Sequence, residues 1–100
     1  MAGPVPIDPT ATVSRAPEQV STEMAEEVVL LGLRTSRYFG LDGVGASVWK
    51  HLAEPRRFDA LIDLVTAEYD VEPGQAAADI TVFLRELESH GLVEIGPPGE

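Results

Sequence analysis

The first half of the chain consists of short apolar runs separated by polar turns, a pattern that is typical of β-strands. Residues 19–24 alternate between apolar and polar positions, and residues 28–33 form a β-branched-rich apolar run of strand length. Residues 38–41 give a third, shorter strand with Phe39 and Leu41 on one face. The pattern therefore predicts a three-stranded antiparallel meander. The predicted half-buried face of the first strand comprises Val20, Thr22 and Met24.

The second half changes to the helical period, with apolar residues three and four positions apart. Asp42 is placed as an N-cap, Pro73 suits the first position of a helix, and Gly91 is placed to end one. The three predicted helices cover residues 43–52, 58–69 and 73–90. Trp49 falls in the first apolar stripe, so we interpret it as a core residue.

This order of elements predicts the α+β class, with a winged-helix-like arrangement of a three-stranded antiparallel sheet followed by three helices. Residues 92–95 are expected to add one short wing strand. Residues 1–14 are rich in proline and small residues, and residues 96–100 read GPPGE, so both ends are predicted to be flexible tails. The predicted domain is residues 15–95.

The charge of the chain argues against nucleic acid as a partner. The formal net charge is -10, and the third predicted helix carries three acids against one arginine. Such a surface repels phosphate, whose neutralisation supplies most affinity for DNA. A winged-helix DNA-binding regulator nevertheless stays an alternative, because three helices can imitate a helix-turn-helix. Acidity that only keeps a small domain soluble is the simplest explanation of the charge.

Composition otherwise mainly excludes functions. The chain has no cysteine, no apolar run long enough to cross a membrane and no secretion signal, so we expect a cytoplasmic protein without membrane contact. The two histidines, His51 and His90, have no metal-ligand spacing, and no phosphate-binding glycine motif is present. Ser36, Ser47 and Ser89 have no base at a recognisable spacing. We therefore expect no enzyme activity, no cofactor and no metal.

One surface remains that could bind a ligand. The third predicted strand is an edge, Gly40 would let another backbone approach it, and the third predicted helix has a wide apolar stripe. A strand edge beside an apolar helix forms a groove for an extended peptide. On the residues alone, burial of both Phe83 and Leu84 in the core is the favoured interpretation of the stripe, and a peptide groove is the alternative.

The spacing of motifs resembles the PqqD-like family. The first motif, a "vLL" strand leading into YF-x-L-[ND]-x-x-[GA]-x-x-[IVL]-W, corresponds to Val28–Leu31 followed by Tyr38, Phe39, Leu41, Asp42, Gly45, Ala46, Val48 and Trp49. The second motif is "ydV" followed by "Dv..FL..L...GLv". It corresponds to Tyr69, Asp70 and Val71, and then to Asp79, Ile80, Phe83, Leu84, Leu87, Gly91, Leu92 and Val93. Together the motifs cover about residues 15–95.

The resemblance implies a RiPP recognition element, which binds the leader segment of a ribosomally made precursor peptide as an extra strand. Within the family, this chain resembles the free-standing members of lasso-peptide pathways, which pass the leader to a transglutaminase-like cysteine peptidase. A chaperone of the pyrroloquinoline quinone precursor peptide is the alternative within the family. We expect a monomer or weak dimer. The implied peptide-binding residues are Arg37, Tyr38, Phe39, Gly40, Ala76, Asp79, Ile80, Phe83, Leu84 and Leu87.

The sequence leaves open which flank of the third helix faces the third strand. At about 100° per residue, Asp79 and Phe83 lie on one flank of the stripe, and Ala77 and Leu84 lie on the other. We predict that the Asp79 and Phe83 flank faces the strand.

Overall fold

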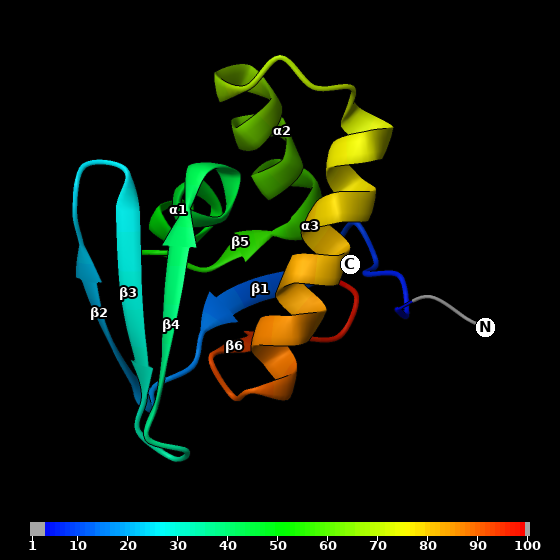
Figure 1. Cartoon of the computed structure of the whole chain (residues 1–100). Coiled ribbons are helices and arrows are strands. Elements are labelled where there is room, and N and C mark those ends of the chain that lie inside the picture. Colours follow the sequence, from blue (N-terminus) through cyan, green and yellow to red (C-terminus); the bar gives the residue numbers. More distant parts are fainter. Residues whose placement is uncertain (1–3, 100) are drawn as a thin grey trace.

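The chain folds into two three-stranded antiparallel sheets and three helices, as a computed structural model that describes residues 4–99 shows (Figure 1). This arrangement confirms the predicted α+β class. The predicted meander is the sheet β2 (Gln19–Glu23), β3 (Glu27–Gly32) and β4 (Arg37–Asp42), in that order. Its register pairs Leu31 with Tyr38 and Leu30 with Phe39 across β3 and β4.

The face predicted for the first of these strands is wrong. Val20 and Met24 are 53% and 48% exposed, whereas Gln19 and Ser21 lie on the inner side of β2. Cross-strand pairing decides this, because Val20 is opposite Leu31 and Ser21 is opposite the fully buried Leu30. Alternation in the sequence predicts a strand, but it does not show which face of that strand meets the core. The pairing register with the neighbouring strand decides which face is buried.

The three predicted helices are confirmed as α1 (Gly43–His51), α2 (Phe58–Glu68) and α3 (Pro73–Ser89). Their apolar stripes meet the inner face of the meander to form one core. Trp49, Leu61 and Leu84 are completely buried in it. Burying a side chain of this size removes enough apolar surface from water to contribute roughly 1.5–3 kcal/mol.

Two helix ends differ in their chemistry from the prediction. Asp42 occupies the N-cap position of α1, but its side chain makes no capping hydrogen bond. The carboxylate of Glu72 instead caps α3, accepting hydrogen bonds from the amides of Gly74 and Gln75 at 3.0 Å each. The predicted stop at Gly91 is confirmed, since this glycine takes a φ of 73° beyond the end of α3.

The predicted N-terminal tail is wrong for the part that the structure describes. Within residues 4–14, Ile7, Ala11 and Val13 are buried, and Val13 is completely inaccessible. The strand β1 (Thr12–Arg15) forms the centre of a second sheet. A four-residue strand after a proline-rich stretch gives no local signal, because its partners lie far away in the sequence.

Those partners are β5 (Arg56–Arg57) and β6 (Val93–Ile95), one on each side of β1. The strand β6 is the wing strand expected over residues 92–95, although it joins the second sheet and not the meander. The end of the chain also differs from a free tail, since the amides of Gly96 and Gly99 donate to the carbonyls of Thr12 and Thr10. Residues 1–3 and 100 of the predicted tails lie outside the described residues.

Candidate functional site: an open strand edge beside the third helix

The strand β4 is an edge of its sheet, with β3 on one side and, within residues 4–99, no strand on the other. Its residues alternate as predicted: Phe39 and Leu41 are half-buried, whereas Tyr38 is 72% exposed and Gly40 faces outward. A Cβ added at Gly40 would meet no atom within 4 Å, so the backbone there is open to another chain. The unpaired backbone groups of such an edge can form hydrogen bonds with an added strand.

The helix α3 lies beyond the free side of β4 (Figure 1). Four of its predicted peptide-binding residues, Ala76, Ile80, Leu84 and Leu87, are at most 3% exposed and hold the helix on the core. Phe83 is only half-buried, and its ring is so close to α1 that a Cβ on Gly45 would lie 3.2 Å from it. Asp79 is exposed, and its carboxylate accepts a hydrogen bond from the side chain of Gln75.

This packing separates the two flanks of α3. Leu84 points into the core, so it is unavailable to a ligand in this conformation. Phe83 packs beside the start of α1, which directly follows β4. These positions favour the Asp79 and Phe83 flank as the one that an added peptide would meet.

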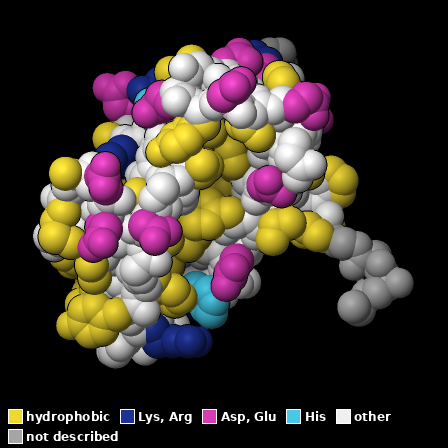
Figure 2. All heavy atoms as spheres, turned by 45° about the horizontal axis from the view of Figure 1, so that its top comes forward, with side chains coloured by type: hydrophobic (Ala, Val, Ile, Leu, Met, Phe, Trp, Pro, Cys, Tyr) yellow, Lys and Arg dark blue, Asp and Glu magenta, His cyan; other side chains and the backbone are white. Residues whose placement is uncertain are grey.

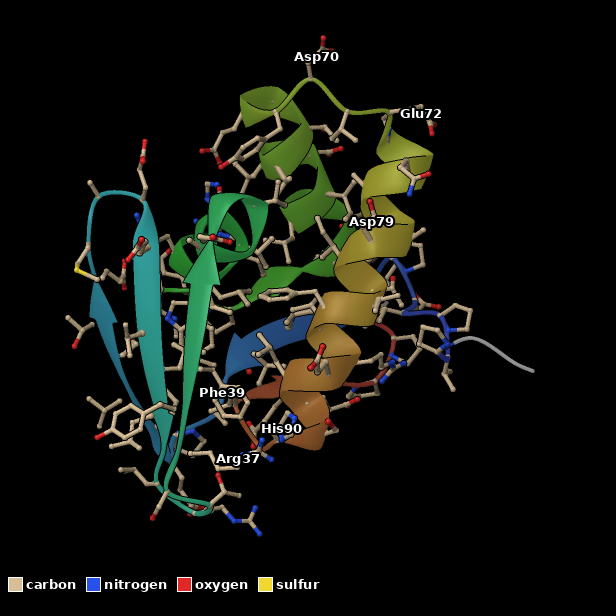
Figure 3. The ribbon with its side chains drawn as sticks, viewed as in Figure 1. Arg37, Phe39, Asp70, Glu72, Asp79 and His90 are labelled. Atoms are coloured by element: carbon tan, nitrogen blue, oxygen red, sulfur yellow. The ribbon has the colours of Figure 1, made fainter. Side chains whose placement is uncertain are left out.

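An aromatic cluster closes the space between β4 and α3 at one end. The ring of Phe39 lies 4.8 Å from that of His90, the residue after α3, and the guanidinium of Arg37 lies 5.6 Å from the Phe39 ring centre (Figure 3). His90 is absent from the predicted site residues. Its position at the end of a predicted helix indicated only that its side chain faces solvent. Its contact with Phe39 depends on tertiary structure.

From this cluster, a hollow lined by apolar side chains runs between the meander and α3 (Figure 2). Acidic side chains stand on both sides of it. Phe39 and Phe83 are half-buried aromatic side chains from its two walls. An open strand edge, an apolar floor and a helix wall are the parts that strand addition of a peptide requires. We call this feature the β4–α3 groove.

A second, polar cavity of about 870 Å³ lies on another face of α1, between the β2–β3 turn and the end of α2. In it, Glu68 Oε1 accepts a hydrogen bond from the Ser47 hydroxyl at 3.0 Å and also contacts His51 Nε2. The hydrogen bond with His51 lowers the pKa of the Glu68 carboxyl. The carboxylate, and not the imidazole, contacts the serine hydroxyl, so this cluster lacks the nucleophile–base pair of a hydrolase.

Within residues 4–99, no group of three or more metal-ligating side chains gathers. In the same part of the chain, every helix is too short or too polar to cross a membrane.

The fold and the groove define a class of small α+β domain that presents an open strand edge beside a helix. Residues 27–93 match the family described as Coenzyme PQQ synthesis protein D (PqqD). The chain belongs to this family, and the PqqD-like resemblance predicted from its motifs is confirmed.

Two solved structures are similar to the chain. One is TbiB1 in complex with the TbiA(beta) leader peptide, with 40% identity, a TM-score of 0.77, and coverage of 81% of this chain and 94% of that one. The other is a lasso peptide synthetase B1 complexed with the leader peptide, with 24% identity, a TM-score of 0.71, and coverage of 82% and 96%. The second shows the fold alone. No curated protein matches the chain.

Proposed function

We propose that this protein binds the leader segment of a ribosomally made precursor peptide, as an extra strand beside β4 and against the Phe83 flank of α3. The observation that carries this proposal is the free edge of β4, which faces an apolar hollow. Backbone pairing would supply affinity, and side chains in the groove would supply specificity. The 40% identity to TbiB1 over nearly its whole length supports a leader peptide as the ligand. The resemblance of the motifs to lasso-pathway members favours a lasso-peptide pathway over pyrroloquinoline quinone synthesis.

In this proposal the protein is a cytoplasmic, non-catalytic adaptor that acts as a monomer or weak dimer. The leader occupies the edge through which two copies could otherwise pair. The acidic surface around the groove disfavours the alternative of a DNA-binding regulator, since a recognition surface for phosphate carries Lys and Arg.

The direct test is titration of this protein into a fluorescently labelled TbiA(beta) leader peptide, followed by anisotropy. We expect saturable one-to-one binding with a Kd in the micromolar range or below, where a Kd of 1 μM corresponds to about -8 kcal/mol. A scrambled peptide of the same composition serves as the control. No saturation below roughly 100 μM, or equal binding of the scrambled peptide, would contradict the proposal.

Truncation of Phe83 should weaken the leader complex more than it weakens the fold. We expect Phe83→Ala to raise the Kd about tenfold, because the ring is a half-buried aromatic contact at the wall of the groove. The matched control is Val82→Ala on the same helix, since Val82 is 52% exposed and adjacent in sequence. Thermal unfolding of both variants separates lost contact from lost structure. Equal Kd values for the two variants would place the leader elsewhere.

We further propose that the protein presents its bound leader to a leader peptidase, a transglutaminase-like cysteine enzyme. Alternate side chains of a strand added beside β4 would point to the outward face of the meander. This face already exposes Val20, Val29 and Tyr38. One surface would then display apolar groups of both the protein and its leader, so the peptidase could distinguish the loaded protein from the empty one.

Val29→Lys tests this presentation step. Val29 is 37% exposed and belongs to the middle strand of the meander, so the variant should keep its affinity for the leader. This protein should accelerate cleavage of the leader by the purified peptidase. We expect that acceleration to fall at least fivefold with Val29→Lys and to stay unchanged with the control Glu94→Lys on β6. Unchanged acceleration in Val29→Lys would exclude this face. A dimer that dissociates only in Val29→Lys, seen by light scattering, would assign the face to self-association instead.

A further inference from the structure

Gly45 lies in the first turn of α1, and neither its backbone nor its helix requires a glycine. Among the described glycines, only Gly43 and Gly91 take a positive φ, so the backbone of Gly45 is one that any residue can adopt. Glycine inside a helix is also less favourable than alanine, by roughly 0.5–1 kcal/mol. The explanation for a glycine here therefore lies in the space around it.

The ring of Phe83 fills that space. A Cβ on Gly45 would lie 3.2 Å from Cε1 and 3.4 Å from Cζ of this ring, which is closer than two carbon atoms ordinarily approach. Gly40 and Gly43 differ, because a Cβ on either would meet no atom within 4 Å. The outer edge of the Phe83 ring thus reaches from α3 to the backbone of α1, with no side chain between them.

This contact limits the β4–α3 groove toward the end of β4, where α1 begins. At the other end, the ring of Phe39 lies 4.8 Å from that of His90 (Figure 3). From Phe83 to His90 a helix rises about 10 Å at 1.5 Å per residue. An extended peptide covers this distance in about three residues, and only alternate side chains face the floor. The space between the two contacts therefore suits one or two inward-facing side chains of a leader.

The ring of Phe83 can yield only toward the groove. It packs against the core cluster that includes Ala46, Ile80 and Leu84, all at most 2% exposed. Protein interiors are close-packed, so this side of the ring gives little. The rest of the ring is open, since Phe83 is only half-buried. A side chain at position 45 would consequently move the ring outward and narrow the groove.

We infer that Gly45 is a specificity-determining residue of the β4–α3 groove. It leaves room for the ring of Phe83 against α1, and thereby sets the size of the leader side chain that fits beside this ring. This inference rests on the proposed function and deepens it, because it names the residue that limits the ligand at one position. A larger residue at position 45 should make the groove prefer a leader with a smaller side chain at that position.

The test is an alanine scan of the TbiA(beta) leader peptide against wild-type protein and Gly45→Val, with Kd values measured by anisotropy. With the unchanged peptide, we expect Gly45→Val to raise the Kd about fivefold or more, because the displaced ring occupies space that the ligand needs. With alanine at one inward-facing position, the two proteins should differ less than about twofold, because the smaller side chain leaves room for the ring. At the other positions the full difference should remain.

Phe83→Ala provides an independent readout, since it removes the ring through which Gly45 acts. In this background, Gly45→Val should change the Kd less than about twofold, and the departure from additivity measures the coupling of the two residues. Ala67→Val enlarges an exposed residue of α2 and should leave every Kd unchanged. Thermal unfolding identifies the folded variants. If Gly45→Val unfolds, Gly45→Ala replaces it and should raise the Kd about twofold, with relief by the same alanine replacement.

Equal binding of the unchanged leader by wild type and every folded Gly45 variant would overturn this inference. A loss of affinity that no alanine replacement relieves, or one that persists in the Phe83→Ala background, would also overturn it, because either result indicates a general effect on the fold. In these cases wild-type protein still binds the leader, so the proposed function stands. Absence of binding by wild-type protein to every peptide would overturn both.

Discussion

Tyr38→Pro is expected to abolish leader binding, with a loss of affinity of at least 100-fold. Proline has no backbone N–H and fixes φ near -65°, so it removes a donor from the edge strand and distorts its extended backbone. The side chain of Tyr38 is 72% exposed and points away from the core, so Tyr38→Ala is the matched control and should change the Kd less than about threefold. Anisotropy with the TbiA(beta) leader peptide measures both.

Circular dichroism should show that Tyr38→Pro keeps its helices. Should the variant unfold, N-methylation of alternate amides in the leader peptide provides the same test from the side of the ligand. One set of methylated peptides should lose binding, because only alternate amides of a paired strand point toward its neighbour. Normal binding of folded Tyr38→Pro, or of both methylated sets, would refute strand addition.

Val13→Asp is expected to produce the largest loss of stability. Val13 lies on the central strand β1, between β5 and β6, and its side chain is completely buried in the hydrophobic core, where a carboxylate would have no partner. An uncompensated buried charge typically costs about 3–5 kcal/mol, which is a large part of the stability of a small domain. Urea unfolding measures this loss against Thr12→Asp, the exposed neighbour on the same strand.

The free energy of unfolding of Thr12→Asp should lie within about 1 kcal/mol of the wild-type value, because exposed substitutions usually have small effects. If Val13→Asp were equally stable, the second sheet would contribute little to the fold, and the predicted tail would have been an adequate description of residues 4–14.

The helices were predictable because their apolar stripes repeat within a single element. Ile80, Leu84 and Leu87 lie three or four residues apart, and all are buried as that period requires. The meander was predictable for a similar reason, since its strands are neighbours in the sequence. The face of β2 was not, because Val20 points outward through its pairing with Leu31.

The candidate site was predictable only in part. The edge strand Arg37–Asp42 follows from the order of strands in a meander, and no other strand of the described part of the chain pairs with its free side. The stripe of α3 did not show which side chains line the groove, because Leu84 and Phe83 are both apolar and differ only in what covers them. His90 belongs to the site because its ring contacts that of Phe39. The two residues are far apart in the sequence, so no local pattern could predict this contact.

The second sheet has a consequence for the order in which the protein can assemble. Val13 pairs with Arg56 on one side and Ile95 on the other, so β1 must wait for residues synthesised much later. The meander, by contrast, closes over short turns, and short-range contacts form faster than contacts between distant segments. A growing chain would thus acquire its peptide-accepting edge before the sheet that locks its two ends together. β6 pairs with β1 and not with β4, so its arrival completes the second sheet and leaves the peptide-accepting edge open.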